Sequence, residues 1–306
     1  KWVEVHDPYA LSSDANSGHS YVIDRKEISR PIQRATSQVK PTEAVIYEMS
    51  VRDFSMQKEA GFSQPGKFAS LSESPTVHGQ TFGLKYLQNL GITHVQLMPV
   101  YDFGSVDEKH PELVYNWGYD PVQYNVPDGS LSSDPHNPYS RIFELQDAIA
   151  AYHKADMSVI MDVVYNHVYE ADNYAFEKIV PGYFYRLDER GIRTNGTFCG
   201  NDVASEKAMV RHYIQQSVQQ WVSLYGFDGF RFDLMGILDI TTMKQIAQEL
   251  KAIYPNIYLY GEGWQMPTGL DSDLLAHQFN AEQLAEYGFF SDHFRDTIKQ
   301  TIVQGS

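Results

Sequence analysis

Strand-like segments alternate with helix-like segments along most of this chain, and two of the strand-like segments end in a carboxylate. The run GFRFD ends at Asp233, and LYGEGW carries Glu262 about thirty residues later. This alternation predicts right-handed crossovers and a parallel sheet. A charge at the end of a buried strand is costly to bury. In a barrel of parallel strands, however, that end carries the catalytic side chains.

Six strands and their helices can be placed from the pattern. The expected strands are 44–51, 93–100, 158–165, 227–233, 256–264 and 288–294; the expected helices are 81–90, 141–154, 206–225, 241–253 and one at the C-terminal end. A long loop is expected before the helix at 141, and a long loop excursion over 166–204. In the helix at 206–225 the expected apolar positions are Met209, Tyr213, Val218, Trp221 and Leu224. The fold class is therefore α/β, with a (β/α)8 TIM barrel over 44–306. With only about six strands up to Ser306, we expect a barrel that is truncated before its end.

Residues 1–43 have a different pattern. VEVHDPYA and NSGHSYVID are typical of short strands joined by Pro, Asn and Gly turns, without helical periodicity. We expect this segment to be the tail of a β-sandwich module, of a carbohydrate-binding type, with its linker.

Composition excludes several classes of partner. The formal net charge of −15 argues against nucleic acid. No apolar run reaches about 18 residues, so no membrane span is expected. The single cysteine, Cys199, allows no internal disulfide, and the N-terminus is not a signal peptide. The compartment stays open between cytoplasmic and secreted or cell-surface.

The residues before Asp233 indicate how its charge is held. Arg231 lies two positions earlier in a strand, so both side chains point to the same side. A neighbouring guanidinium favours an ionised carboxylate, the form that a nucleophile requires. The alternative is an Arg–Asp pair that only stabilises the barrel.

Glu262 stands between Gly261 and Gly263 after an aromatic-rich strand. The glycines predict open space around the carboxylate. Partial burial against aromatic rings would favour its protonated form, as a general acid requires. An ordinary loop glutamate is the alternative.

DVVYNH (162–167) ends the third strand. Asp162 and His167 are expected at the barrel mouth, with His167 as a donor to a ligand hydroxyl. A purely structural histidine is the alternative. Asn166 offers an amide oxygen that could ligate calcium.

Four motifs in this order resemble the α-amylase superfamily. DVVYNH, GFRFDLMG (229–236) and YGEGW (260–264) are similar to the first three signature regions of that family, and YNWGYDP (115–121) is similar to the hallmark of type I pullulanases. The resemblance implies a retaining glycoside hydrolase of debranching type, acting on an α-glucan polysaccharide or oligosaccharide. No organic cofactor is required, and calcium is allowed.

The resemblance also implies roles for individual residues. Asp233 matches the nucleophile, Glu262 the general acid/base, and Arg231 the arginine that keeps the nucleophile charged. The remaining matches are a sugar-binding histidine, a supporting aspartate and a tyrosine that stacks on the sugar, which are His167, Asp162 and Tyr119. Trp264 is a candidate platform on the leaving-group side, whereas Trp117 is expected to shape its loop by packing.

Two departures from the family pattern bear on function. Met235 and Gly236 stand where many α-1,4-acting amylases have Lys-His, which favours a branch-point enzyme. The family's fourth region, a histidine-aspartate pair on the seventh strand, has no counterpart. Asp292 and His293 have the wrong order and the wrong strand.

The function expected is hydrolysis of α-1,6 branch linkages in pullulan, amylopectin or glycogen. An isoamylase-like or glycogen-trimming enzyme is the nearest alternative. A non-catalytic α-glucan-binding protein, or an inactive fragment, is the alternative from another class. For calcium, the loop excursion is rich in oxygen ligands without a recognisable spacing, namely Glu170, Asp172, Asn173, Asn201 and Asp202.

Overall fold

The fold is built on one curved parallel sheet. In the computed structural model, which describes residues 2–37 and 39–304, six strands pair in the order β1-β4-β7-β8-β9-β10, and every pairing is parallel. Their bounds are β1 Ile46–Met49, β4 His94–Leu97, β7 Ser158–Val163, β8 Gly229–Phe232, β9 Tyr258–Gly261 and β10 Gly288–Phe289. Strand order follows chain order, as in a (β/α)8 barrel. The predicted α/β fold with about six strands is confirmed.

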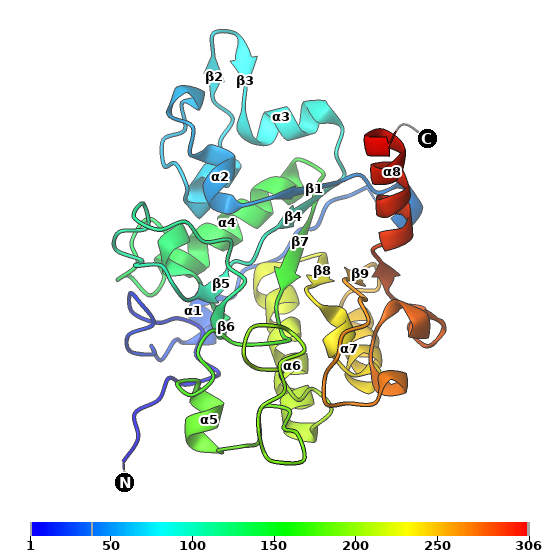
Figure 1. Cartoon of the computed structure of the whole chain (residues 1–306). Coiled ribbons are helices and arrows are strands. Elements are labelled where there is room, and N and C mark those ends of the chain that lie inside the picture. Colours follow the sequence, from blue (N-terminus) through cyan, green and yellow to red (C-terminus); the bar gives the residue numbers. More distant parts are fainter. Residues whose placement is uncertain (1, 38, 305–306) are drawn as a thin grey trace.

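Helices follow the strands, and most of them cover the outer side of the sheet (Figure 1). The longer ones are α3 Gly83–Leu90, α4 Ser140–Lys154, α6 Ala208–Gln220, α7 Ile240–Ile253 and α8 Asp292–Gln304; α6 continues as a π-helix over Trp221–Tyr225. Four of the predicted apolar positions are buried, namely Tyr213, Val218, Trp221 and Leu224. Met209 is 60% exposed, and Val210 is buried in its place. The predicted apolar face of this helix was therefore wrong by one position at its start.

The loop expected before α4 contains a hairpin. Strand β5 (Tyr101–Phe103) pairs antiparallel with β6 (Pro121–Pro127), and YNWGYDP forms the end of the connection between them. Sequence reasoning missed it because β5 has only three residues and β6 begins and ends with proline. The hairpin stands at the C-terminal side of β4 and carries this loop toward the strand ends.

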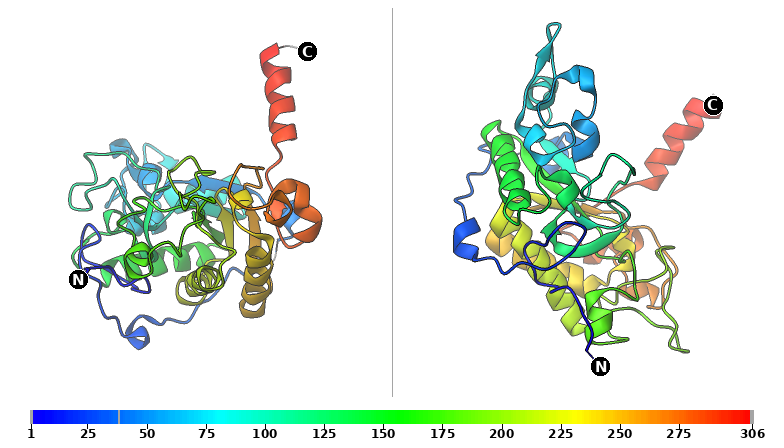
Figure 2. Two further views of the ribbon diagram at one scale, coloured as in Figure 1. Left: turned by 60° about the horizontal axis from the view of Figure 1, so that its bottom comes forward. Right: turned by 90° about the vertical axis from the view of Figure 1, so that its left-hand side faces the viewer.

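Shorter elements complete the chain. They are α1 Arg25–Ile28, α2 Val51–Ser55, α5 Ala175–Ile179 and the small hairpin of β2 (Thr76–Val77) and β3 (Gln80–Thr81). The expected strand at 288–294 is only two residues long, and α8 begins at Asp292. In Figure 2, α8 extends away from the rest of the molecule.

The N-terminal segment lies against the helices. Its described residues form no strand of two residues or more, only an isolated bridge between Ser13 and Ser20, so the two short strands predicted there were wrong. Hydrogen bonds to the barrel hold this segment instead: Arg34 donates to Asp228 at 2.6 Å, and Tyr213 donates to the Pro8 carbonyl at 2.8 Å. Its assignment to a β-sandwich module stays a prediction.

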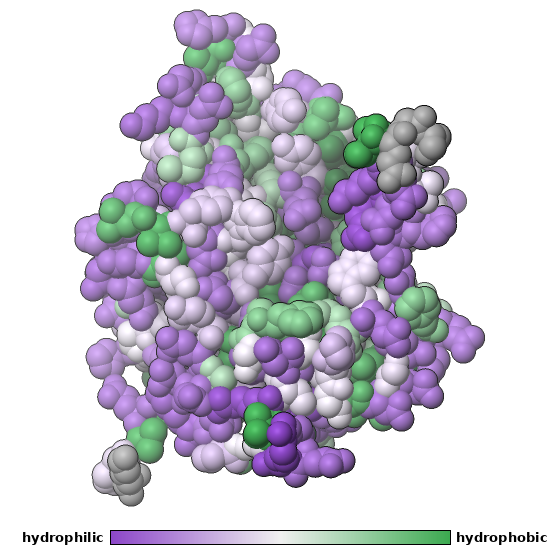
Figure 3. All heavy atoms as spheres, viewed as in Figure 1, coloured by the Kyte–Doolittle hydropathy of each residue, from purple (hydrophilic) through white to green (hydrophobic). Residues whose placement is uncertain are grey.

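The surface seen in Figure 3 is mostly hydrophilic, with hydrophobic residues in separate groups. Among the described residues, no helix is both long and apolar enough to cross a membrane.

Candidate active site

Three adjacent strands carry the acidic residues that the sequence singled out. Asp162 lies in β7, Asp233 follows β8 directly, and Glu262 follows β9 directly. The register pairs Asp162 with Arg231 across β7 and β8. Because the strands are parallel, their C-terminal ends meet at one edge, and the three carboxylates converge there.

One guanidinium contacts all three carboxylates. Arg231 Nη1 lies 3.0 Å from Asp162 Oδ1 and 2.9 Å from Asp233 Oδ1, while its Nη2 lies 2.7 Å from Glu262 Oε1. Burial acts to lower the pKa of Arg231, but the carboxylates, Asp162 first, raise it above its ordinary value. Arg231 therefore stays charged, and its ion pairs link the C-terminal end of β8 to those of β7 and β9.

Asp162 is fully buried beneath the site. Besides Arg231, it accepts hydrogen bonds from the Tyr119 hydroxyl at 2.9 Å and from Gln96 Nε2 at 3.3 Å. Burial raises the pKa of Asp162 to about 8; Arg231 acts against this and Asp233 adds to it. Tyr260 donates in turn to Gln96 Oε1. Sequence reasoning missed Gln96 and Tyr260, which only the pairing of distant strands brings together.

Asn166 holds the backbone and side chain of Asp233. Its Nδ2 donates to the Asp233 carbonyl at 2.7 Å and to Oδ2 at 3.0 Å, and its Oδ1 lies 2.6 Å from His167 Nδ1. Both ends of the amide are thus engaged with protein atoms. Asn166 does not fit the calcium site suggested for it, and its contacts are those of a residue that positions Asp233.

His167 is buried beside the site rather than open to it. Its Nδ1 faces Asn166 Oδ1, and its Nε2 faces the Tyr119 carbonyl at 2.9 Å. A neutral imidazole has one N–H, so only one of these contacts is a hydrogen bond. Burial lowers the pKa of His167 to about 4. Contact with a ligand hydroxyl therefore requires Nε2 to leave the Tyr119 carbonyl.

Glu262 is held by the chain around Asp233. In addition to the Arg231 ion pair, its Oε2 accepts from the Leu234 N–H at 3.2 Å. Leu234 has φ +41°, a left-handed conformation that is strained for a non-glycine residue and is found at functional sites. This backbone donor had no signal in the sequence.

The glycines beside Glu262 allow close packing, not open space. A Cβ on Gly261 would lie 2.7 Å from the Phe232 carbonyl oxygen, and one on Gly263 would lie 2.4 Å from the Phe289 ring. The expected empty surroundings were therefore wrong. The space is occupied, and only glycine lets β9 continue past its neighbours.

Gly236 has a similar steric requirement. A Cβ there would lie 1.9 Å from the Trp264 carbonyl oxygen, and the Gly236 N–H donates to the Glu262 carbonyl at 3.1 Å. A histidine at this position would collide with the backbone after β9. The Met235-Gly236 pair thus allows the segments that follow β8 and β9 to pack closely against each other.

The carboxylates open into a cleft of about 610 Å³ with an aromatic wall. The residues lining it are Glu48, Met49, Ser50, Asp53, Met98, Tyr115, Trp117, Tyr119, Arg231, Asp233 and Glu262. Trp117 is 59% exposed, which does not fit the packing role expected of it.

Two further predicted positions lie outside the residues that line this cleft. Trp264 has the Arg295 guanidinium 5.6 Å from its ring centre, so a platform role for it stays a prediction. Asp292 lies in the first turn of α8 and accepts from Gln278 at 3.2 Å. Asp292 and His293 therefore do not supply the missing pair, as expected.

A metal ion has a different candidate location from those considered in the sequence. Oxygen atoms of Asp102, Glu108 and Asp128 lie within 4.8 Å of one another, and all three residues are buried. Within the described part of the chain, the one ion pair of Arg141 is with Glu108, at 3.1 Å. Gln123, 95% buried, donates to Asp102 at 2.7 Å, and its Oε1 has no partner among the described residues. Carboxylate and amide oxygens are the ligands that calcium prefers, so this donor set fits such an ion.

Burial leaves the negative charge of this acidic cluster poorly compensated. It raises the pKa of Asp102 to about 7, with the nearby Glu108 adding to the shift. The pKa of Asp128 is also raised, by burial and then by Glu108. In the loop excursion, by contrast, Asp202 already accepts from Thr194 at 2.7 Å and from the Gly196 N–H at 2.8 Å.

Comparisons with known proteins agree with this geometry. The Alpha amylase catalytic domain model matches residues 56–181. A pullulanase of Bacillus subtilis (strain 168) is 43% identical over 303 residues, which are 98% of this chain and 42% of that protein.

Solved structures show that the similarity extends to the fold of almost the whole of this chain. A Paenibacillus barengoltzii pullulanase in complex with maltohexaose and α-cyclodextrin is 46% identical with a TM-score of 0.94, covering 97% of this chain and 47% of that one. An Anoxybacillus sp. LM18-11 pullulanase complexed with maltotriose is 46% identical with a TM-score of 0.95, covering 97% and 43%. The chain spans less than half the length of these proteins. It belongs to the α-amylase superfamily and, within it, to the type I pullulanases.

Proposed function

We propose that this protein is a retaining glycoside hydrolase that cleaves α-1,6-glucosidic branch linkages in pullulan, amylopectin or glycogen. One observation carries the proposal: Arg231 joins Asp162, Asp233 and Glu262 at the ends of β7, β8 and β9, at the floor of an aromatic-walled cleft. Two carboxylates with different surroundings are what glycosidic cleavage requires.

In this proposal, Asp233 is the nucleophile. It is 9% exposed, so its carboxylate is largely desolvated but reachable from the cleft. Arg231 and Asn166 fix its two oxygens. Asp233 attacks the anomeric carbon while Glu262 gives a proton to the leaving oxygen. Water activated by Glu262 then releases the covalent glycosyl-enzyme, a course that requires the two carboxyl groups to be about 5–5.5 Å apart.

Glu262 must change partners to act as the acid. In this structure its Oε1 is engaged in an ion pair with Arg231 at 2.7 Å. The glycosidic oxygen therefore has to take the place of Arg231 beside Glu262 when substrate enters. With 22% of its side chain exposed, Glu262 is the most accessible of the three carboxylates and can make this exchange.

Tyr119 and His167 are the proposed sugar contacts at the cleavage point, and Asp162 supports them. Asp162 holds the Tyr119 hydroxyl, and the Tyr119 carbonyl in turn faces His167. This chain of contacts orients the aromatic ring above the carboxylates. Losing Asp162 would therefore disturb both Arg231 and Tyr119.

Three observations support cleavage of the α-1,6 linkage: the YNWGYDP motif, the Met235-Gly236 pair and the similarity to proteins named pullulanase. An isoamylase-like or glycogen-trimming enzyme is separated from this proposal by substrate choice. We expect maltotriose to be released from pullulan faster than chains are released from glycogen. Debranching of glycogen without attack on pullulan would favour the alternative.

A glucan-binding protein without catalysis is the other alternative. The four residues Asp233, Glu262, Arg231 and His167 occur together, which argues against decay of the site. The sequence contains no histidine-aspartate pair of the fourth region on a later strand. Retention of maltooligosaccharides by this chain, with no products from pullulan, would favour this reading.

We further propose that calcium binds at the acidic cluster of Asp102, Glu108 and Asp128, with Gln123 Oε1 as an added ligand. Bound there, the ion would neutralise the two negative charges that Arg141 leaves uncompensated. It would join the β5–β6 hairpin to the N-terminal segment, since the Asn16 N–H donates to Glu108 at 2.9 Å. The cluster lies outside the cleft residues, so its proposed role is to stabilise the fold.

A further inference from the structure

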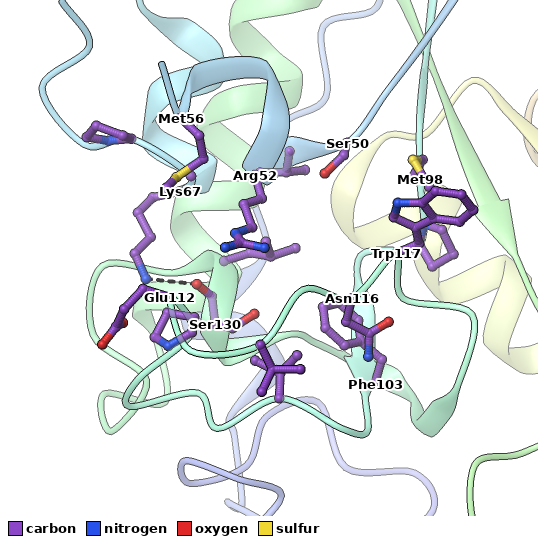
Figure 4. Close-up of a pocket in the computed structure, with 18 of the residues that line it drawn as sticks. Ser50, Arg52, Met56, Lys67, Met98, Phe103, Glu112, Asn116, Trp117 and Ser130 are labelled. Carbon is purple, nitrogen blue, oxygen red and sulfur yellow. Dashed lines mark hydrogen bonds between the residues drawn. The ribbon is translucent and has the colours of Figure 1, made fainter. Parts of the chain in front are cut away.

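A second cavity adjoins the cleft (Figure 4). It has a volume of about 340 Å³, within the range of small-ligand sites, roughly 300–1,000 Å³. Ser50, Met98 and Trp117 line both the cavity and the cleft. Its other walls come from α2, the segment at 65–67 and the β5–β6 connection. A chain lying in the cleft can thus reach this cavity past Trp117.

Trp117 is held rigidly between the two spaces. Its indole N–H donates to the Tyr115 hydroxyl at 2.6 Å, and the Tyr115 hydroxyl donates to Asp53 at 2.5 Å. The Arg52 guanidinium lies 5.2 Å from the centre of the Tyr115 ring. An indole that is 59% exposed and also fixed by hydrogen bonds is a pre-organised contact surface, because little side-chain entropy remains to be lost on binding. Flat aromatic faces of this kind suit sugar rings.

Arg52 is the unsatisfied polar group of this cavity. Figure 4 shows its guanidinium reaching from α2 into the middle of the space. Among the described residues it makes no hydrogen bond or ion pair, and Nη1 is buried without a partner. A buried donor without an acceptor is costly, so a ligand oxygen here would gain a hydrogen bond to a charged group.

The remaining wall combines apolar and polar groups. Met56, Pro65 and Val106 provide apolar contact, and Lys67 is tied to the Ser130 carbonyl at 2.8 Å. Burial lowers the pKa of Lys67. Glu112 adds an exposed carboxylate that can accept from a hydroxyl. Donors and acceptors beside an apolar surface match the hydroxyls and ring faces of a hexose.

We infer that this cavity is a chain-length subsite that binds a glucosyl unit of an α-1,4-linked chain beyond the cleavage point. The inference rests on the proposed function, because it takes the chain in the cleft to be an α-glucan. Trp117 then serves as the surface over which the chain passes from Asp233 and Glu262 to Arg52. Short chains would fill the cleft alone, whereas longer chains would also occupy the cavity.

Equilibrium binding of maltotriose and maltohexaose, measured by calorimetry, tests this inference. Val114→Trp places a large ring in the cavity from a wall position that is 47% exposed, and Arg52→Gln removes the guanidinium. Val45→Trp is the matched control, because Val45 is 51% exposed and lines neither space. Circular dichroism and thermal unfolding confirm that each variant is folded.

We expect Arg52→Gln to bind maltohexaose about tenfold more weakly, as loss of one hydrogen bond to a charged group predicts. Val114→Trp should weaken maltohexaose binding by about as much, because its ring occupies the space of the glucosyl unit. Maltotriose binding should stay within about twofold for all variants, since the cleft is unchanged. Equal affinity of the wild type for both sugars, or no selective loss in either cavity variant, would overturn the inference while leaving the proposed function intact.

Two other outcomes are also decisive. If the wild type binds neither sugar, the proposed function fails and the subsite fails with it. Arg52, Lys67 and Lys109 also make the cavity lining basic, so inorganic phosphate is included as a competitor. Phosphate that displaces the sugar from the wild type but has no effect on Arg52→Gln would identify an anion site and overturn the glucan assignment.

Discussion

Two clusters in this protein have the same composition, three carboxylates and one arginine, but differ in how the arginine is shared. In the catalytic cluster, Arg231 contacts Asp162, Asp233 and Glu262. In the acidic cluster, the Arg141 guanidinium forms an ion pair with one of the three carboxylates, that of Glu108. In the first cluster one guanidinium bridges all three carboxylates, and Asp233 and Glu262 face a cleft. The second cluster is buried, and among the described residues its two aspartates have no ion-pair partner.

The difference shows how similar residues acquire different uses. In the proposed mechanism, the exposure of Glu262 lets it exchange Arg231 for a substrate oxygen, as an acid must. Asp102 and Asp128 have no such freedom, because both are buried at 1% exposure or less. A cluster that cannot exchange partners with solvent must hold either protons or a cation.

Asp233→Asn should lower the rate of pullulan hydrolysis by roughly 10³-fold or more, because the amide cannot form the glycosyl-enzyme. Thermal unfolding should change little, since Asn keeps the shape and can still accept from Arg231. Release of maltotriose measures the rate. Asp102→Asn is the matched control in the acidic cluster, and it should keep its activity in the presence of calcium. Substantial turnover by Asp233→Asn would show that another residue is the nucleophile.

Removing each arginine compares the clusters directly. Arg231→Met leaves three carboxylates at the strand ends, and we expect a loss of about 3–5 kcal/mol in the free energy of unfolding. Arg141→Met should cost a similar amount without calcium but much less with it, because a cation can replace the guanidinium there. Urea unfolding with and without calcium measures both. Equal rescue of the two variants by calcium would remove the distinction between the clusters.

Calcium should raise the unfolding temperature of the wild type, and a chelator should lower it. At a calcium concentration about 100 times Kd, the expected gain is about 2.7 kcal/mol. Asp128→Asn should abolish the gain, whereas Glu262→Gln should keep it. No change in the wild type on adding calcium would mean that protons, not an ion, balance the acidic cluster.

The His167 imidazole should stay neutral at pH values below 6.5, the ordinary pKa of histidine. Burial lowers its pKa from the ordinary 6.5 to about 4 in the folded state, so the unfolded chain binds the proton first. Its contribution to stability is therefore present above pH 6.5 and is lost as the pH falls from 6.5 toward 4. NMR titration of the imidazole, with the exposed His110 as reference, measures this. A midpoint for His167 near that of His110 would contradict the buried geometry.

Local sequence patterns were enough to predict the parallel sheet and the positions of Asp162, Asp233 and Glu262 on it. Strand-like runs that end in carboxylates can be recognised without knowing their neighbours. The β5–β6 hairpin was not recognised, because β5 is only three residues long and β6 has proline at both ends. The acidic cluster was missed for the same reason: the hairpin is what brings Asp102 and Asp128 together.

Glycine and asparagine positions show the limit of sequence reasoning most clearly. Gly261 and Gly263 predicted space, but the tertiary structure fills it with Phe232, Met235 and Phe289. Asn166 offered a calcium ligand, yet it binds Asp233, a residue 67 positions away. A side chain's partner depends on which atoms the fold brings within about 3 Å, and separation along the chain carries no such information.

Hydrophobic runs and short motifs are local properties, so the strand order, the superfamily and the carboxylates near strand ends could be predicted without a structure. The folded barrel was needed to see that Arg231 is shared among three carboxylates, that Glu262 is paired with Arg231, and that a second cavity lies beyond Trp117. These are contacts between segments far apart in the chain, and packing of the whole barrel sets their distances.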